Sequence, residues 1–352
     1  MLVNSQDIIY NNFKMINKNY KKQIKLLDCT LRDGGSVNKW DFGHQNIMSI
    51  LQTLNFANID IVEIGFLQNG YQNSYDLSIS DNTKNFDEKL EQIVNKNFKA
   101  VAMIDIGKFD IEELPQKKYT YIDGIRLMFK KSELELAFQT SLKIMEKGYS
   151  LSLNPVSVTT YDERDIEQLC DKTNSLMPDI LYIIDTYGLM NNEETLKYFR
   201  TFNECLDCEI EIGYHAHNNL QLAYSNSIQI INNKNNRNIV VDGSLYGMGK
   251  RAGNTPTELL AYYLNTQFDA SYNLKKIDDI IEQVIMPMKN NFEWGYSLIH
   301  YIAAINGCHS DYVTYLYNEK RVPLSRISDI LKLIPNDKKL IFDKTCISEI
   351  NT

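Results

Sequence analysis

The residues of this chain whose types and spacing best suit a metal site are two histidines and one aspartate. His215 and His217 stand two residues apart in the stretch GYHAHNN, and Asp33 follows an apolar run in LLDCTLRDGG. Residues two apart on a strand project from the same face, so the two imidazoles would point together. Neutral imidazoles and a carboxylate are good ligands for a divalent cation. The pattern therefore predicts a metal site, with a hydrogen-bonded pair of core histidines as the alternative.

Arg32 directly precedes Asp33, which places opposite charges side by side where the apolar run ends in two glycines. Two histidines and one carboxylate leave coordination positions open, as in catalytic rather than structural metal sites. A guanidinium beside the metal can bind carboxylate or enolate oxygens of a 2-oxo acid in a fixed fork, which argues against the iron oxygenases that use the same ligands. The alternative is a plain salt bridge from Arg32 to Glu63 or Asp105, and Glu63 could orient Arg32 in either case.

These residues need a fold that brings distant segments to one place. Short apolar segments rich in β-forming residues recur along the chain, separated by stretches with apolar residues three and four apart, as in amphipathic helices. The predicted strands are 24–30, 59–66, 99–105, 124–129, 149–158, 180–188, 209–218 and 239–249. Eight β-α units over roughly 250 residues predict a TIM (β/α)8 barrel. The alternative fold is a doubly wound open sheet. It is less favoured because neither G-x-G-x-x-G after the first strand nor a P-loop motif occurs.

In such a barrel the active site lies at the carboxyl ends of the strands, so the polar residues there are the candidates for chemistry. We expect Arg32, Asn154 and Thr186 to bind substrate. The full predicted ring is Arg32, Asp33, Glu63, Asp105, Asn154, Asp185, Thr186, His215, His217 and Asn254.

The chain turns helical without strands after about residue 275, so we predict a barrel domain over 1–270 and a C-terminal helical extension over 271–352. The extension carries a short region rich in aromatic residues and histidine, NFEWGYSLIHYIAAINGCHSDY. Aromatic residues at helical spacing usually pack in a core, which is the simpler interpretation of this region.

Composition excludes several classes of protein. The 352 residues carry a formal net charge of −8 with no concentrated Lys/Arg block, so nucleic-acid binding is not expected. No signal peptide and no run near the ~20 apolar residues of a membrane span is found, and we expect a cytoplasmic protein that does not bind membranes. The six scattered cysteines predict reduced thiols, with the pair Cys205 and Cys208 as a coincidental C-x-x-C.

Four motifs in order, LLDCTLRDGG, VEIGF, GYHAHNNLQLAYSNSI and GMGKRAGNTPTELLAYYL, resemble the aspartate-arginine-glutamate TIM-barrel metallolyases, the DRE-TIM superfamily. This superfamily includes 4-hydroxy-2-oxovalerate aldolase, hydroxymethylglutaryl-CoA lyase, and the isopropylmalate and homocitrate synthases. The resemblance covers about residues 24–265, and in length and helical tail the chain is most similar to the aldolase group.

The resemblance implies that Asp33, His215 and His217 bind a divalent metal (Mn, Mg, Co or Zn), with Asn254 as a fourth ligand or behind the others. It also implies that Arg32 stabilises an enolate and that Glu63 holds Arg32. A metal acting as a Lewis acid and a fixed cation would then stabilise the same developing oxyanion.

The chain departs from each subgroup. The aldolases carry a histidine base shortly after R-D-G, whereas this chain reads RDGGSVNKWDFG, with His44 as the closest histidine. The hydroxymethylglutaryl-CoA lyases carry a cysteine in the loop that reads GMGKRAGN here, and the synthases carry a glutamate where Lys250 stands. Tyr296 or Tyr301 could supply the tyrosine acid of the aldolases. As proton acceptor we favour metal-bound water, with His44, His300, Tyr296 and Tyr301 as the side-chain candidates.

The function we expect is a metal-dependent aldolase that cleaves or forms a 4-hydroxy-2-oxo acid from pyruvate, or a similar 2-oxo acid, and an aldehyde. An acyl-CoA-dependent Claisen synthase and a non-catalytic barrel subunit are the alternatives. We also expect a homo-oligomer, with the extension as a docking surface for a partner enzyme.

Overall fold

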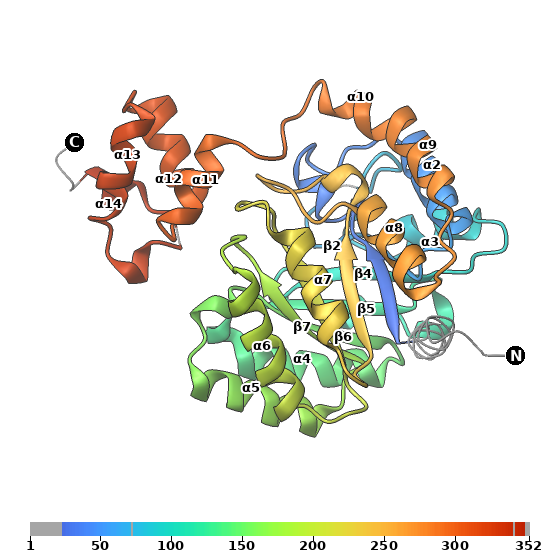
Figure 1. Cartoon of the computed structure of the whole chain (residues 1–352). Coiled ribbons are helices and arrows are strands. Elements are labelled where there is room, and N and C mark those ends of the chain that lie inside the picture. The colour runs from blue at the N-terminus through green and yellow to red at the C-terminus, as the bar shows by residue number, and fades with distance from the viewer. Residues whose placement is uncertain (1–22, 72, 341, 349–352) are drawn as a thin grey trace, which may run out of the picture.

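The computed structural model describes residues 23–71, 73–340 and 342–348, with a closed barrel of parallel strands at its centre (Figure 1). The barrel strands are β1 (Ile24–Asp28), β2 (Ile61–Leu67), β4 (Lys99–Asp105), β5 (Gly124–Phe129), β6 (Ser150–Pro155), β7 (Ile180–Asp185), β8 (Glu211–Ala216) and β9 (Ile239–Gly243). They pair in chain order, and β1 pairs with both β9 and β2, which closes the ring. The short β3 (Ile79–Ser80) pairs with the end of β2. The predicted TIM barrel is confirmed.

Helices surround the barrel in the intervals between strands (Figure 1). They are α2 (His44–Phe56), α3 (Lys84–Glu91), α4 (Leu134–Glu146), α5 (Glu163–Leu176), α6 (Asn192–Cys205), α7 (Ala223–Asn233) and α8 (Thr257–Phe268). Between β4 and β5 the chain forms only the 3-10 turns Ile111–Glu113 and Lys117–Tyr119. Pro115 lies between these turns, and because its nitrogen cannot donate a hydrogen bond, a longer helix is disfavoured there.

Burial on both faces explains why the strands are nearly continuous apolar runs. Every residue of β7 is buried. Inside the ring, side chains of several strands pack together, among them Leu27, Ile61, Val101, Tyr182 and Val240. The outward side chains pack against the helices in one large core.

Five strands, β1, β6, β7, β8 and β9, end earlier than the sequence pattern predicts, and the backbone after β6 and β9 shows the reason for those two. β6 ends at Pro155 because Ser157 adopts a left-handed backbone conformation (φ 59°) that turns the chain away. β9 ends at Gly243, and a 3-10 turn at Leu245–Gly247 follows it. Further 3-10 turns lie at Gly34–Ser36, Lys131–Glu133, Val158–Thr160 and Asn336–Lys338.

The division between barrel and extension lies later than residue 270. Helix α9 (Leu274–Ile280), which continues through a π turn (Ile281–Ile285) into α10 (Met286–Lys289), packs against α2 and α8. Its apolar residues, like Trp294, join the barrel's core, because they cover apolar surface that α2 and α8 would otherwise expose. The separate lobe consists of α11 (Leu298–Ile305), α12 (Ser310–Thr314) with a π turn (Tyr315–Glu319), α13 (Leu324–Leu331) and α14 (Lys344–Ser348). This lobe has its own core and stands apart in Figure 1.

Cys170 on α5 and Cys205 at the end of α6 form a disulfide, with their Cα atoms 6.0 Å apart. The expectation that all the cysteines are reduced is therefore wrong for this pair, because the packing of α5 on α6 brings two distant cysteines together. Cys205 is not joined to Cys208, which is an exposed free thiol. Among the described helices, none combines the length and the apolar character that crossing a bilayer requires.

Candidate metal centre and active site

The three predicted metal ligands meet at the carboxyl end of the barrel. Asp33 lies just after β1, His215 lies in β8, and His217 lies one residue beyond the end of β8. One ligand atom from each of the three lies within 4.8 Å of the other two. His217 was expected inside the strand, but it forms an isolated antiparallel bridge with Asn254 instead. The extended backbone across Ala216 still turns both imidazoles to the same side, with ring centroids 5.1 Å apart.

Both imidazoles are oriented by a partner on Nδ1. His215 Nδ1 donates to Asp242 Oδ2 at 3.0 Å, and His217 Nδ1 donates to the carbonyl oxygen of Asp185 at 3.2 Å. Each Nε2 is therefore left as the unprotonated nitrogen that can bind a cation, which is the usual arrangement in metal sites. Burial lowers the pKa of His215, and this favours the neutral imidazole that a ligand requires.

Asp33 is buried and remains a carboxylate. Burial alone would raise its pKa, but Arg32 and then His217 outweigh that effect and hold the pKa well below its usual range. Asn254 Nδ2 donates to Asp33 Oδ2 at 2.7 Å, and the buried Oδ1 of Asn254 has no hydrogen-bond partner among the described residues. Gly249 permits this approach, because a Cβ there would lie 2.4 Å from Asn254 Nδ2 and 2.9 Å from Asp33 Oδ2.

A layer of buried charges supports the site from below. Arg32 Nε donates to Glu63 Oε2 and Arg32 Nη1 to Asp33 Oδ1, each at 2.7 Å. Arg126 forms ion pairs with Glu63 (2.9 Å) and with Asp242 (2.6 Å). Arg126 also lies over the ring of Tyr182 at 4.3 Å, and the Tyr182 hydroxyl donates to Asp242 Oδ1 at 3.0 Å.

The charges of this layer favour a bound cation. The carboxylates of Asp33, Glu63 and Asp242 face the guanidinium groups of Arg32 and Arg126, and all five side chains are buried. One negative charge therefore exceeds the positive ones while His215 is neutral, and buried charges are stable only when they are paired or bind a metal. The two free Nε2 atoms, the Asp33 carboxylate and the unpartnered Asn254 Oδ1 fit a divalent cation.

A cavity of about 300 Å³ opens above these residues. Asn154, Thr186 and Asp105 line it together with Arg32, Asp33 and both histidines. The Asn154 amide oxygen accepts a hydrogen bond from Arg126 Nη2 at 3.2 Å when the amide is oriented to satisfy both of its polar atoms. Asp105 pairs with Lys108 at 2.5 Å, so Arg32 contacts Glu63 and not Asp105.

Several predicted residues lie outside the cavity lining. Asp185 accepts hydrogen bonds from the backbone of Leu189 and Met190, and so it shapes a turn. Tyr296 is 59% exposed in the segment before α11, and Tyr301 is 38% exposed on α11. The structure does not bring these two tyrosines to the predicted metal ligands, because both are exposed and neither lines the cavity.

His44 and His300, which were considered as proton acceptors, also do not line the cavity. His44 begins α2, where its ring meets Tyr75 edge-on at 5.8 Å. His300 lies on α11, and burial together with Arg251 lowers its pKa to about 4.

Sequence reasoning missed Arg126, Asp242 and Tyr182, and it named Lys250 only as a difference from the synthases, without a role. Arg126 and Asp242 each stand within an apolar strand, GIRLMF and IVVDG, and a charged residue in a buried strand requires a partner. That signal could have identified them as a pair. Lys250 lines the cavity at the loop after β9, where burial and Arg251 lower its pKa.

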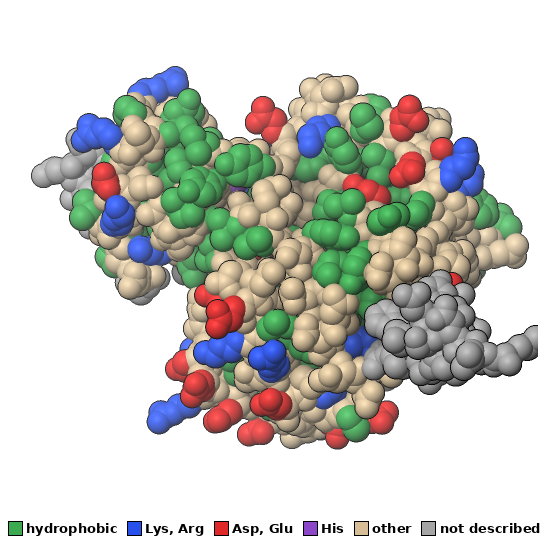
Figure 2. Space-filling model, in the orientation of Figure 1, with side chains coloured by type: hydrophobic (Ala, Val, Ile, Leu, Met, Phe, Trp, Pro, Cys, Tyr) green, Lys and Arg blue, Asp and Glu red, His purple; other side chains and the backbone are tan. Residues whose placement is uncertain are grey.

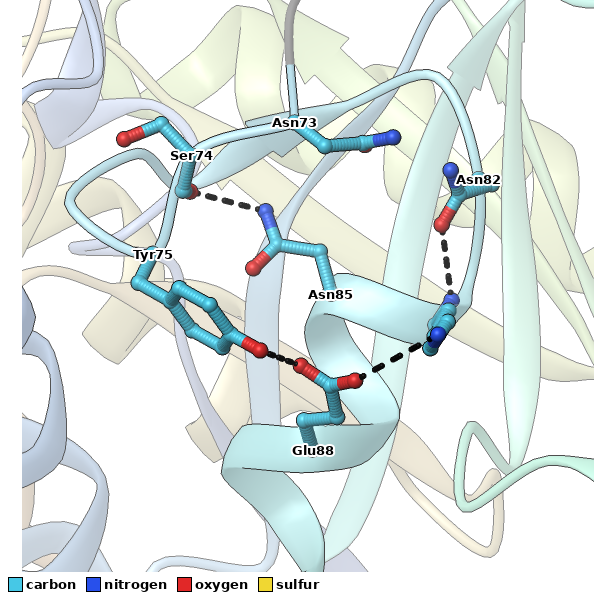
Figure 3. A pocket seen from close by; sticks show the side chains of 7 residues that line it. Asn73, Ser74, Tyr75, Asn82, Asn85 and Glu88 are labelled. Atoms are coloured by element: carbon cyan, nitrogen blue, oxygen red, sulfur yellow. Dashed lines mark hydrogen bonds and ion pairs between the residues drawn. The ribbon is translucent and has the colours of Figure 1, made fainter.

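A small surface hollow of about 180 Å³ lies at the loop before α3, away from the predicted metal ligands. Figure 3 shows that its polar side chains contact one another: the Tyr75 hydroxyl donates to Glu88, and Asn85 donates to the carbonyl oxygen of Ser74. Lys84 pairs with Glu88 at 3.9 Å. Because these groups are already satisfied, we assign no chemistry to this hollow.

Comparison with known proteins agrees with this geometry. Residues 23–284 match the model of the HMGL-like family. The chain is 26% identical over 304 residues to 4-hydroxy-2-oxovalerate aldolase from Geobacillus genomosp. 3, a match that covers 86% of this chain and 87% of the relative. It is 27% identical over 274 residues to the enzyme of the same name from Geobacillus thermodenitrificans, which covers 76% and 77% of the two chains.

Solved structures share the fold. The N-terminal domain of a proposed aldolase from Bacteroides vulgatus superposes with a TM-score of 0.69 at 22% identity, over 84% of this chain and 98% of that one.

Proposed function

The chain belongs to the HMGL-like family, and from this premise we propose that it is a divalent-metal-dependent carbon-carbon lyase of the aldolase type. It would cleave or form a 4-hydroxy-2-oxo acid from pyruvate, or a similar 2-oxo acid, and an aldehyde. The observation that carries the proposal is the position of Arg32 beside Asp33, His215 and His217 in one cavity. The names of the similar Geobacillus enzymes support the same reaction.

Asp33, His215 and His217 would hold the cation, with the Asn254 amide oxygen as a fourth ligand or directly behind them. When bound, a divalent cation supplies Lewis acidity that stabilises negative charge on a 2-oxo oxygen. Manganese, magnesium, cobalt and zinc are all compatible with these donors, and elemental analysis of the purified protein would identify the one used.

Arg32 is the residue that binds the enolate in this proposal. Its Nε and Nη1 atoms are held by Glu63 and Asp33, and its Nη2 atom takes part in none of the hydrogen bonds that the described residues form. Because Arg32 lines the cavity, Nη2 is available to a carboxylate or enolate oxygen of the substrate. A fixed guanidinium that meets developing negative charge lowers the barrier without reorganisation.

Asn154 and Thr186 would position the rest of the substrate. Both line the cavity, on the carboxyl side of β6 and β7. The backbone nitrogen of Ser157 donates to Thr186 Oγ1 at 2.7 Å, so the threonine hydroxyl hydrogen is free to donate to the substrate.

For proton transfer at the substrate hydroxyl, the cavity offers Lys250 Nζ as an alternative to metal-bound water, and we assign the step to Lys250. Lys250 lines the cavity and forms none of the ion pairs found among the described residues, whereas Lys108 is paired with Asp105. Its lowered pKa makes the neutral amine, which can accept a proton, more accessible. In the synthetic direction the same atom would return the proton to the aldolate oxygen.

The reaction can be tested with the purified protein loaded in turn with each of the four metals. Pyruvate and acetaldehyde are supplied, and the aldol product is identified by mass spectrometry. Formation of 4-hydroxy-2-oxovalerate that stops when a chelator is added would support the proposal. Release of free CoA from acetyl-CoA and a 2-oxo acid would instead indicate a Claisen synthase, and stoichiometric metal without turnover would indicate a non-catalytic subunit.

We also propose a homo-oligomer that uses the surface of the extension, or a partner enzyme that docks there. Leu298, Tyr301 and Ile305 are spaced as one face of α11, and each is at least 38% exposed. Figure 2 shows hydrophobic side chains gathered on the lobe and on the neighbouring barrel surface. Sedimentation analysis of the wild type and of Ile305→Glu would test the oligomer, which should dissociate in the variant.

A further inference from the structure

A second large cavity, of about 820 Å³, lies between the barrel and the extension. On the barrel side it is lined by the loops that follow β5, β6 and β7, which supply Lys130, Lys131, Ser157 and Tyr187. On the extension side His309 contributes to the lining. These loops extend from the carboxyl ends of the strands, where TIM barrels bind their substrates.

The second cavity adjoins the cavity of about 300 Å³ that Asp33, His215 and His217 line, which we call the metal cavity. Val156 and Thr186 line both of them, so these two side chains form the boundary between the cavities. The hydrogen bond from the Ser157 nitrogen fixes Thr186 at this boundary. A substrate held at the metal centre could therefore extend past Thr186 into the second cavity.

The size of the second cavity exceeds what a short aldehyde needs. The metal cavity, at about 300 Å³, already reaches the lower end of small-molecule sites, which span roughly 300–1,000 Å³. It would accommodate pyruvate and acetaldehyde, and the adjoining space is more than twice as large, at about 820 Å³. A larger electrophile would use that space.

The lining suits a chain of hydroxyl groups. The Ser157 hydroxyl donates to Tyr187 and the Thr160 hydroxyl donates to the carbonyl oxygen of Ser157, so both offer oxygen atoms that accept hydrogen bonds from a ligand. Asn336 offers an amide that both donates and accepts. Tyr187 and Phe342 offer ring surfaces for the carbon skeleton. Alternating polar groups and rings are what a polyhydroxylated molecule contacts with its hydroxyl groups and its C–H faces.

The charge of the lining suits an anion. Among the described residues that line the second cavity, Lys130 and Lys131 are charged and no carboxylate is present. Lys130 is exposed and forms none of the ion pairs among the described residues, and Lys131 pairs with Asp165 at the start of α5. Among the described lining residues, Lys130 is therefore the unpaired cation, with the Lys131–Asp165 pair next to it in the chain, and an unpaired ammonium group favours a ligand that carries a phosphate or carboxylate.

We propose that the electrophile is a polyhydroxylated aldehyde with a phosphate or carboxylate at its far end. The carbonyl carbon lies in the metal cavity, and the anionic end lies at Lys130 and Lys131. This rests on the proposed aldolase function. In synthesis, the enolate carbon of pyruvate forms a bond to the aldehyde carbon, the carbonyl electron pair moves to the aldehyde oxygen, and that oxygen takes one proton; cleavage is the reverse.

Matched pairs of aldehydes test the proposal. With pyruvate and the metal-loaded enzyme, D-erythrose is compared with D-erythrose 4-phosphate, and propionaldehyde with succinic semialdehyde. We expect kcat/KM for at least one anionic aldehyde to exceed that of its neutral counterpart by about tenfold or more, since a charge-assisted contact of this kind is worth that much. The two pairs separate a phosphate site from a carboxylate site.

The double variant Lys130→Gln/Lys131→Gln should lose this preference while its kcat/KM for the neutral aldehydes stays unchanged. Lys143→Gln is the control, because Lys143 is an exposed lysine on α4 that pairs with Glu112 outside both cavities. An equal loss for neutral and anionic aldehydes in the double variant, or an equal loss in the control, would overturn the assignment.

Exchange of the pyruvate methyl protons with deuterated water requires the enolate but no aldehyde. It therefore tests the aldolase function separately from the choice of aldehyde. Exchange without any preference for anionic aldehydes would overturn the assignment of the second cavity and leave the aldolase function standing. Absence of both exchange and aldol product would overturn both.

Discussion

His217 offers the cleaner test of the metal site, because the two histidines differ in what else they do. His215 is 3% exposed and partners the buried Asp242, whereas His217 contacts only a backbone carbonyl besides the site. We expect His217→Ala to lose bound metal and turnover while the barrel stays folded, because the buried Asp33 keeps its contacts with Arg32 and Asn254. Metal content by elemental analysis and folding by circular dichroism check this. His300→Ala, outside the cavity, should keep its metal, and full metal occupancy in His217→Ala would contradict the site.

Arg32→Lys should keep the fold but lose turnover. A lysine cannot contact Glu63, Asp33 and a substrate oxygen together, because it lacks the planar fork that Arg32 uses. Loss of one donor to a developing oxyanion typically costs ~10² to 10³ in kcat. Steady-state kinetics at equal metal occupancy measure the effect. Near-normal kcat would mean that Arg32 is only a structural ion-pair partner.

Lys250→Met should separate proton transfer from enolate formation. We expect kcat for aldol cleavage to fall by about 10² or more, the usual contribution of a general acid or base. Decarboxylation of oxaloacetate gives the same enolate without removing a hydroxyl proton, so this reaction should continue in the variant. Both rates can be followed through pyruvate release. Equal losses in the two reactions would remove Lys250 from proton transfer.

At the scale of elements, the barrel strands β2, β5 and β9 carry one charge network across the interior. Glu63, Arg126 and Asp242 come from these three strands, and each is at most 2% exposed. The network connects Arg32 to His215, so the same contacts that link the strands also orient a proposed metal ligand and the arginine proposed to bind the enolate.

Arg126→Met should destabilise the protein strongly. Removing the guanidinium leaves the carboxylates of Glu63 and Asp242 buried without their shared partner, and breaking a buried pair in this way costs about 3–5 kcal/mol. Urea denaturation of the metal-free protein measures the free energy of unfolding. Arg200→Met, on the exposed side of α6, should change it by less than about 0.5 kcal/mol. A similarly small change in Arg126→Met would show that the network is not stabilising.

At the scale of the whole molecule, the extension is held to the barrel through polar contacts near the mouth of the metal cavity. Arg251 Nη2 donates to His309 Nε2 at 2.6 Å, and the Tyr187 hydroxyl donates to the carbonyl oxygen of Leu340 at 3.1 Å. Burial and Arg251 lower the pKa of His309 to about 4. The docked lobe therefore favours the neutral imidazole.

Acidification should loosen this docking. Because the pKa is lowered in the docked state, the contribution of His309 is complete above its ordinary pKa of about 6.5 and is lost as the pH falls toward 4. His300 has a lowered pKa for the same reasons and acts in the same direction. Small-angle X-ray scattering should show a larger radius of gyration at pH 4.5 than at pH 7 in the wild type. The double variant His300→Gln/His309→Gln should show a smaller change, and an equal expansion in both proteins would contradict the prediction.

The sequence alone was sufficient to predict the barrel and to single out polar residues that meet at the carboxyl end of its strands. Apolar runs of strand length separated by amphipathic stretches encode the β-α alternation locally, and the carboxyl ends of parallel strands meet at one edge whatever the details of packing. Asp33, His215, His217 and Arg32 were identifiable because each is polar and lies at or just beyond the end of such a run. The exact ends of β6 and β9 were not, because they depend on a left-handed residue and a 3-10 turn.

The buried charge pairs that support these residues, and the position of the neighbouring lobe, were decided only by the tertiary structure. Arg126 and Asp242 are 116 residues apart, so no local pattern reports that they pair, although each violates the apolar pattern of its own strand. Tyr296 and Tyr301 are exposed in the folded chain, which their sequence positions did not reveal. The position of His309 and the second cavity depend on how the lobe meets the barrel. The periodicity of a strand depends on residues that are neighbours in the sequence. The pairing of buried charges and the docking of the lobe depend on distances that exist only after the chain has folded.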